Sequence, residues 1–182
     1  MAGHEHVFDA RHAWFLDIIF RKLIQDPRRI LKDHIHAGMS VLDVGCGPGY
    51  FSIPISKMVG PRGKVIAADI QQGMLDRLLK KLSPAQKRII HLHKCSGTRI
   101  GVSQQVDFAL VFYVLHEVSD QEGFLREIHS VLKPGGTALV IEPCFHVTKK
   151  EFEQSLSSVG KTGFTRMKGP SVFISRSILL KK

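Results

Sequence analysis

Three glycines stand at alternate positions in the stretch VLDVGCGPGYFS, residues 41–52. They are Gly45, Gly47 and Gly49, and the acid Asp43 precedes them at the end of an apolar run. Glycine has no Cβ atom and adopts backbone angles that other residues avoid. A turn of this composition lets its backbone approach another group very closely, so we expect a ligand-binding turn here.

The spacing of the glycines distinguishes between two kinds of ligand. A dinucleotide-binding turn has the pattern G-x-G-x-x-G, whose last glycine lets a helix pack closely on a strand. Here Tyr50 takes the position of that last glycine. The carboxylate of Asp43 would also repel a pyrophosphate, whereas it would attract a ligand that carries an ammonium and a sulfonium. The residues therefore favour a cationic ligand over a nicotinamide dinucleotide.

The elements that position this turn follow an alternating order. From Met39 onward, short apolar runs typical of strands alternate with stretches of helical period, which predicts an α/β fold with a parallel sheet and helices on both faces. Only residues 169–171 separate the last two runs, so we expect these to pair as an antiparallel hairpin. The expected strands are residues 39–44, 63–70, 87–93, 106–115, 137–143, 163–169 and 172–182, and the expected helices are residues 48–58, 73–82, 120–132 and 148–159.

The N-terminal segment, residues 1–38, precedes this alternation. Apolar residues recur with a helical period over residues 10–24, and Asp26 followed by Pro27 is typical of the start of a second, short helix. We therefore expect two units, a helical lid formed by residues 1–38 and a core formed by residues 39–182.

Three motifs, in this order, resemble those of the class I S-adenosylmethionine-dependent methyltransferases, in particular the type 11 group that includes ubiquinone and menaquinone methyltransferases. They are VLDVGCGPGYFS, VIAADIQQGML at residues 65–75 and VLKPGGTALVIEP at residues 131–143. The resemblance implies one Rossmann-like, doubly wound sheet of seven strands in the order 3-2-1-4-5-7-6, with the last strand antiparallel. It also implies S-adenosyl-L-methionine as cofactor and S-adenosyl-L-homocysteine as product.

The resemblance assigns cofactor-binding roles to residues at the ends of the expected strands. Asp43 would orient the turn and receive the methionine ammonium, and Asp69 would accept hydrogen bonds from the ribose hydroxyls. Ile70 would lie against one face of the adenine. The remaining implied contacts, to the methionine moiety and the sulfonium, come from Gly45, Cys46, Gly47, Gly49 and Phe112.

One turn departs from the pattern of this group. The group often places an Asp after the third strand, where its carboxylate binds the adenine amino group. Here Ser96 falls at that position and Gly97 follows it. A hydroxyl can accept the same hydrogen bond without a charge, so we expect adenine recognition by Ser96 or by a backbone group near Gly97.

Candidate catalytic residues follow the fourth expected strand. Tyr113 and His116 stand in the stretch FYVLHEV, and a histidine with a pKa near neutral could serve as a general base. A histidine at this point could equally be a structural residue that a neighbour satisfies. Cys144 and His146 are too few ligands for a metal site, so we expect no metal.

Composition limits the possible partners. The chain of 182 residues has a net charge of +10, with its basic residues in scattered pairs. We expect methyl transfer to a small molecule or metabolite, although the charge leaves open an RNA or protein methyltransferase. A non-catalytic cofactor-binding module is a further alternative, and monomer and homodimer are both compatible with the sequence.

The apolar runs and the cysteines indicate the compartment. No run approaches the roughly 20 apolar residues that cross a bilayer, so we expect no membrane span. The three cysteines are widely spaced, which is typical of reduced thiols rather than of a disulfide framework. We therefore expect a cytoplasmic protein.

Overall fold

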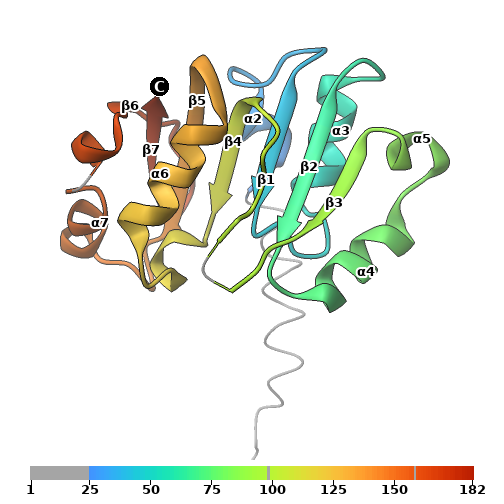
Figure 1. Cartoon of the computed structure of the whole chain (residues 1–182). Coiled ribbons are helices and arrows are strands. Elements are labelled where there is room, and N and C mark those ends of the chain that lie inside the picture. Colours follow the sequence, from blue (N-terminus) through green and yellow to red (C-terminus); the bar gives the residue numbers. More distant parts are fainter. Residues whose placement is uncertain (1–24, 98, 158) are drawn as a thin grey trace, which may run out of the picture.

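The computed structural model describes residues 25–97, 99–157 and 159–182 (Figure 1). The expected helix over residues 10–24 lies outside this described part, as does most of the expected lid. The helices are α2 (Pro27–Leu31), α3 (Ser52–Val59), α4 (Gln72–Lys81), α5 (Pro84–Lys87), η1 (Leu115–Glu117), α6 (Gln121–Val131), α7 (Lys149–Ser155) and η2 (Val159–Thr162). The strands are β1 (Ser40–Val44), β2 (Lys64–Asp69), β3 (Ile90–Lys94), β4 (Val106–Phe112), β5 (Leu132–Pro143), β6 (Thr165–Lys168) and β7 (Ser175–Lys181).

The strands form one sheet in the order β3-β2-β1-β4-β5-β7-β6. Strands β1 to β5 pair in parallel, while β7 runs antiparallel to both β5 and β6. Val41 of β1 lies opposite Val65 on one side and Phe108 on the other, so β1 and β4 occupy the centre of the sheet. The predicted strand order and the antiparallel last strand are confirmed.

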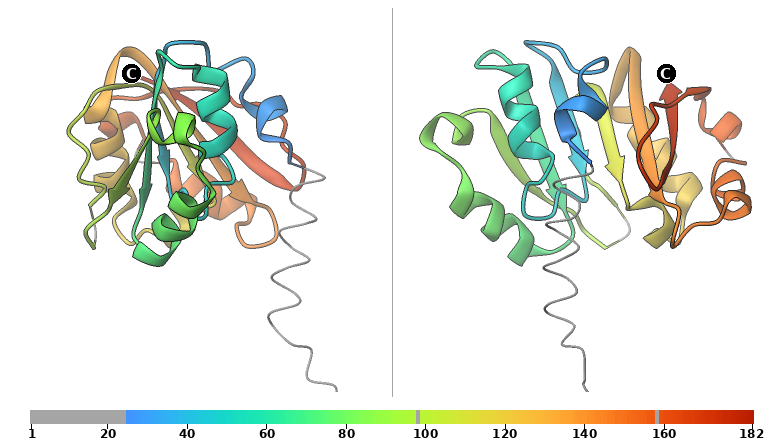
Figure 2. Two further views of the ribbon diagram at one scale, coloured as in Figure 1. Left: turned by 90° about the vertical axis from the view of Figure 1, so that its right-hand side faces the viewer. Right: turned by 180° about the vertical axis from the view of Figure 1, so that it is seen from behind.

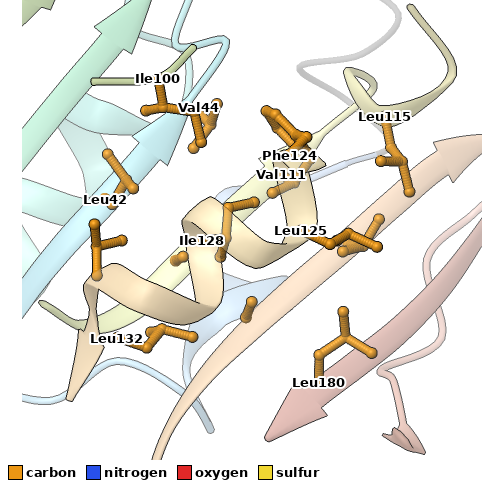
Figure 3. Close-up of a cluster of buried hydrophobic side chains, with 14 of the residues drawn as sticks. Leu42, Val44, Ile100, Val111, Leu115, Phe124, Leu125, Ile128, Leu132 and Leu180 are labelled. Carbon is orange, nitrogen blue, oxygen red and sulfur yellow. The ribbon is translucent and has the colours of Figure 1, made fainter. Parts of the chain in front are cut away.

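Helices cover both faces of this sheet, as a doubly wound fold requires. Helices α2, α3 and α4 pack on one face, which Figure 2 shows from behind, and α6 and α7 pack on the other. Alternate residues of each strand serve the two layers. In β1, Leu42 points to the α6 side and Val41 to the α3 side. Figure 3 shows Leu125 and Ile128 of α6 turned toward the sheet, with Leu125 on the side of Leu115 and Leu180.

The backbone conformation of single residues sets where several elements begin or end. Strand β4 ends at Phe112 rather than at residue 115, because Tyr113 has a φ of 60° and the chain then turns into η1. Helix α3 begins at Ser52 rather than at residue 48, because the glycines up to Gly49 have positive φ. Pro54 therefore lies in the first turn of α3, where a proline costs no helical hydrogen bond.

The carboxyl ends of β1, β2 and β4 meet at one edge of the sheet, the lower edge in Figure 1. The chain leaves β1 toward β2 on one side, while β4 lies on its other side, so the strand order reverses between β1 and β4. Open α/β sheets bind ligands at such a reversal. The fold thus places the glycine turn after β1 at the expected binding position.

Phe108 tests the centre of this fold, because its side chain is fully buried in β4. We expect Phe108→Ala to lower the free energy of unfolding by about 3–5 kcal/mol, since it leaves a cavity in a packed core. Urea denaturation would measure the change. Phe173→Ala is the matched control, because Phe173 is 56% exposed and its removal should cost less than about 0.5 kcal/mol. Equal losses would contradict this account of the core.

Candidate functional site

A cavity of about 1380 Å³ opens at the carboxyl edge of the sheet. This volume exceeds the roughly 300–1,000 Å³ that is common for small-molecule sites. Most of the residues expected from the sequence line it: Asp43, Gly45, Cys46, Gly47, Gly49, Asp69, Ile70, Gly97, Phe112 and Tyr113. Ser96 and His116 are not among the lining residues. The structure therefore brings together ten of the twelve predicted positions.

Glycine is needed at the three positions of the turn for different physical reasons. A Cβ atom on Gly45 would lie 2.3 Å from Val114 Cγ2, and one on Gly49 would lie 2.3 Å from Leu78 Cδ1. These two glycines therefore let the turn pack against its own neighbours. A Cβ atom on Gly47, where φ is +51°, would meet nothing within 4 Å. Gly47 is thus the position where the cavity reaches the backbone of the turn.

Asp43 presents a buried carboxyl group beneath this turn. It is 2% exposed, and Ser52 Oγ donates a hydrogen bond of 2.5 Å to its Oδ2 atom. Burial raises the pKa of Asp43 to about 7, and the nearby charge of Asp69 adds to the effect. A cation bound in the cavity would favour the charged form of this carboxyl group.

Asp69 ends β2 and joins two loops. Its Oδ2 atom accepts the N–H of Gly47 at 2.8 Å, and its Oδ1 atom accepts the N–H of Gln71 at 2.7 Å. A carboxylate has about four acceptor positions, so two remain for ligand hydroxyls. Ile70 follows directly and is 53% exposed, which gives the cavity a flat apolar surface next to this acid.

The loop after β3 contributes backbone rather than the expected hydroxyl. Ser96 and Arg99 exchange backbone hydrogen bonds of 3.1 and 2.8 Å in a tight turn. Cys95 and Gly97, on either side of Ser96, line the cavity while Ser96 does not. The structure therefore favours a backbone contact near Gly97 over a side-chain contact from Ser96.

Cys46 lies within the turn but offers no thiol chemistry. Its side chain is buried, and burial raises the pKa of the thiol above its ordinary value. The thiol therefore stays protonated at neutral pH, which leaves a backbone role for this residue.

Aromatic rings form the wall at the end of β4. Phe112 lies 4.4 Å from the ring of Phe51 and stacks at 4.1 Å on the ring of Tyr113, centroid to centroid. The hydroxyl of Tyr113 is within 2.6 Å of Ser175 Oγ and accepts a hydrogen bond of 2.7 Å from Gln25 Nε2. Sequence reasoning missed Gln25 and Ser175, because they come from the chain before α2 and from the start of β7, and no local motif marks either.

His116, the other candidate catalytic residue, is not among the residues that line this cavity. Its Nδ1 atom bonds to Glu142 Oε2, and Glu142 also accepts the N–H of Leu115 at 2.9 Å. Burial raises the pKa of Glu142, and the neighbouring imidazole opposes this shift. His116 thus holds a buried acid at the end of β5, and its ring lines a separate cavity of about 430 Å³ together with His146.

Within residues 25–97, 99–157 and 159–182, no cluster of three or more His, Cys, Asp or Glu side chains could hold a metal ion. Among the same residues, no helix has the length and apolar character needed to cross a bilayer.

This fold and this pair of acids around a glycine turn define a class I S-adenosylmethionine-dependent methyltransferase. The family model described as "methyltransferase domain" matches residues 41–136, and the chain belongs to that family. The expectations of the family and of S-adenosyl-L-methionine as its cofactor are confirmed.

Two similar curated proteins carry the name demethylmenaquinone methyltransferase. The chain is 33% identical over 126 residues to the demethylmenaquinone methyltransferase of Lactococcus lactis. The aligned region covers 67% of this chain and 50% of that protein. The chain is 34% identical over 110 residues to the enzyme of the same name from Lactobacillus johnsonii, covering 59% of this chain and 45% of that protein. The chain thus spans about half the length of these relatives.

Solved structures share the fold over a larger part of the chain. A SAM-dependent methyltransferase from Aquifex aeolicus is 27% identical with a TM-score of 0.76, covering 96% of this chain and 97% of that one. Fibrillarin from Aeropyrum pernix, solved with S-adenosyl-L-methionine bound, is 16% identical with a TM-score of 0.65, covering 80% of this chain and 67% of that one.

The raised pKa of Asp43 makes the stability of the cofactor-free chain depend on pH. The folded chain keeps the Asp43 proton up to about pH 7, while the unfolded chain loses it near the ordinary value of 3.8. The stabilisation is therefore complete below about pH 4 and is lost as the pH rises through about 7. We expect the melting temperature of Asp43→Asn, which mimics the protonated group, to fall less between pH 5 and pH 8 than that of the wild type. Parallel curves for the two proteins would contradict the raised pKa.

Proposed function

We propose that the chain transfers a methyl group from S-adenosyl-L-methionine to a small aromatic acceptor. One observation carries this proposal: a single cavity contains both the acids at the ends of β1 and β2 and the aromatic wall at the end of β4. Cofactor and acceptor could therefore lie side by side in one space. The proposal agrees with the names of the curated relatives, which act on demethylmenaquinone, a quinone.

We assign the cofactor contacts to residues whose geometry fits them. Gly47 leaves space beside the backbone for the methionine moiety, and buried Asp43 offers a carboxylate to its ammonium. Asp69 keeps acceptor positions for the two ribose hydroxyls, and Ile70 faces the adenine. The aromatic ring of Phe112 flanks the sulfonium, which the electron-rich face of a ring attracts. When bound, the cofactor supplies an electrophilic methyl group and its leaving group.

Tyr113 is the residue we assign to the acceptor. It lines the cavity at the end of β4, and its φ of 60° is uncommon for a residue with a side chain. Such strain often marks a functional position. Gln25 and Ser175 hold its hydroxyl in place, so the phenol oxygen could accept or donate a hydrogen bond to the acceptor in one orientation.

The N-terminal segment, residues 1–38, fits the role of a lid over this cavity. Asp26 and Pro27 at the start of α2 line the cavity, and Gln25 bonds to Tyr113. The described start of this segment, residues 25–27, therefore lies at the acceptor side. Free Cys46, Cys95 and Cys144 agree with a reducing compartment, so we propose a cytoplasmic enzyme.

Methylation of RNA or protein is a second candidate. Four basic side chains line the cavity: Arg77, Lys80, Lys81 and Arg99. Together with the net charge of +10, they could attract a polyanion. Binding that falls steeply with salt would support this alternative.

A methyl-transfer experiment separates these candidates. The full chain would be incubated with radiolabelled S-adenosyl-L-methionine and a cell extract, which is then divided into RNA, protein and small-molecule fractions. We expect the label in the small-molecule fraction. Label in RNA or protein would favour the second candidate, and cofactor binding without any transfer would indicate a non-catalytic binding module.

Asp69 tests the cofactor assignment. We expect Asp69→Ala to weaken cofactor binding on the order of tenfold or more, because it removes the charged acceptors assigned to the ribose hydroxyls. Isothermal titration calorimetry would measure the affinity, and NADH should show no binding to either protein. Asp76→Ala is the control, because Asp76 is exposed on α4, bonds to Gln72 and does not line the cavity. Unchanged affinity in Asp69→Ala would refute the assignment.

Tyr113 tests the acceptor assignment. We expect Tyr113→Phe, which keeps the ring and removes the phenol oxygen, to lower kcat on the order of a hundredfold with little effect on cofactor affinity. His116→Gln should leave kcat nearly unchanged, because His116 does not line the cavity. A larger loss in His116→Gln than in Tyr113→Phe would reverse these roles.

A further inference from the structure

Three large apolar side chains lie exposed at the carboxyl edge of the sheet, beside the cavity. Phe145 follows β5 and is 59% exposed, while Phe173 and Ile174 precede β7 and are 56% and 49% exposed. The N–H of Cys144 donates to the carbonyl of Ile174 at 3.0 Å, which joins the two loops. We call Phe145, Phe173 and Ile174 the edge patch. Contiguous exposed apolar groups of this kind mark interaction surfaces.

The backbone holds one member of this edge patch in an unfavourable conformation. Ile174 has a φ of 50°, in the left-handed region that β-branched residues avoid. A glycine or asparagine would suit this position, and about half of the isoleucine residue stays exposed. The strain therefore presents an aliphatic side chain to the surroundings at a position where stability alone would select another residue.

Two pairs of basic residues stand close to the edge patch in the sequence or through one contact: one pair follows Phe145, and the other follows Gln25, which contacts Phe173. Lys149 and Lys150 begin α7 shortly after Phe145, and both are exposed. Arg28 and Arg29 lie in α2, next to Gln25, whose side chain donates to the carbonyl of Phe173 at 3.2 Å. Lysines in the first turn of a helix oppose the helix dipole, so Lys149 and Lys150 are not placed to stabilise α7. None of the ion pairs between described residues includes either lysine.

The edge patch also adjoins the proposed acceptor side of the cavity. The ring of Phe145 meets the ring of Tyr113 edge-on, with 6.4 Å between the centroids. Tyr113 lines the cavity, so a surface seated on the edge patch would lie at its rim. In Figure 1 this rim is the lower edge of the sheet, where β5 ends and α7 begins.

We propose that this edge docks on an anionic lipid bilayer. The aromatic and aliphatic side chains of the edge patch would enter the interface, and the two basic pairs would contact acidic headgroups. The charge complementarity favours this partner, and aliphatic Ile174 favours lipid over nucleic acid, because it has no ring on which a base could stack. Docking would turn the rim of the cavity toward the bilayer, so an acceptor dissolved in the lipid could enter directly.

Vesicle co-sedimentation of the full chain tests the proposal without cofactor or methyl transfer, so its outcome is independent of the proposed activity. We expect binding to vesicles of phosphatidylcholine mixed with phosphatidylglycerol, little binding to phosphatidylcholine alone, and weaker binding at high salt. Equal binding to both vesicles, or none, would overturn the proposal.

Paired variants locate the surface. We expect Phe173→Ser combined with Ile174→Gly to reduce binding on the order of tenfold, and Lys149→Gln combined with Lys150→Gln to do the same. Gly suits the φ of residue 174, so the first variant should stay folded. The matched controls are Leu79→Ser, an exposed apolar residue on α4, and Lys87→Gln combined with Arg88→Gln, at the end of α5. Equal losses in the controls would contradict docking through this edge.

Two further measurements exclude other occupants. In Phe173→Trp, brominated lipids should quench the fluorescence of the added tryptophan, with the wild type as background. An absence of quenching would overturn the proposal that the edge patch inserts into the bilayer. Light scattering would show whether Phe173→Ser with Ile174→Gly converts a dimer to a monomer, which would assign the edge patch to a second copy of the chain. Loss of single-stranded RNA binding in the same variant, with vesicle binding retained, would assign it to RNA.

Discussion

The Asp69 carboxylate is the constraint on which the rest of the site depends. It accepts the N–H of Gly47 from the turn after β1 and the N–H of Gln71 from the start of the next helix. One buried side chain therefore fixes the relative position of two loops that come from neighbouring strands. The link joins Gly47, which has open space beside its backbone, to the loop that carries exposed Ile70.

Asp43 is a second buried acid in the same region, close to Asp69. Asp43 and Asp69 end neighbouring strands, both are buried, and their mutual repulsion adds to the burial that raises the pKa of Asp43. A cationic ligand relieves both effects, whereas an anionic one would increase them. In the proposed function, the preference for a cofactor that carries an ammonium and a sulfonium comes from these two strand ends.

The carboxyl edge of the sheet is divided along its length. The ends of β1 and β2 and the loop after β3 form the proposed cofactor side, while the end of β4 provides an aromatic wall. Beyond that wall, the loops after β5 and before β7 carry the edge patch. The antiparallel β7 makes this possible, because it returns the chain to the same edge and places Ser175 opposite Pro143. Cofactor chemistry and surface docking thus share one edge without sharing residues.

By itself, the sequence determined the alternation of strands and helices, and the resemblance carried by its motifs implied the strand order. Most of the residues that these motifs marked line the cavity, because the glycine turn and the acids at strand ends are local patterns that act through neighbouring backbone. The sequence also determined that Tyr113 belongs near the cavity. Only the tertiary structure turned His116 away toward Glu142, left Ser96 off the cavity wall, and brought Gln25 and Ser175 to the Tyr113 hydroxyl. These outcomes depend on which way a side chain points after a strand ends and on pairing between segments far apart in the chain. No local pattern encodes that pairing, because its free energy arises only when the sheet has assembled.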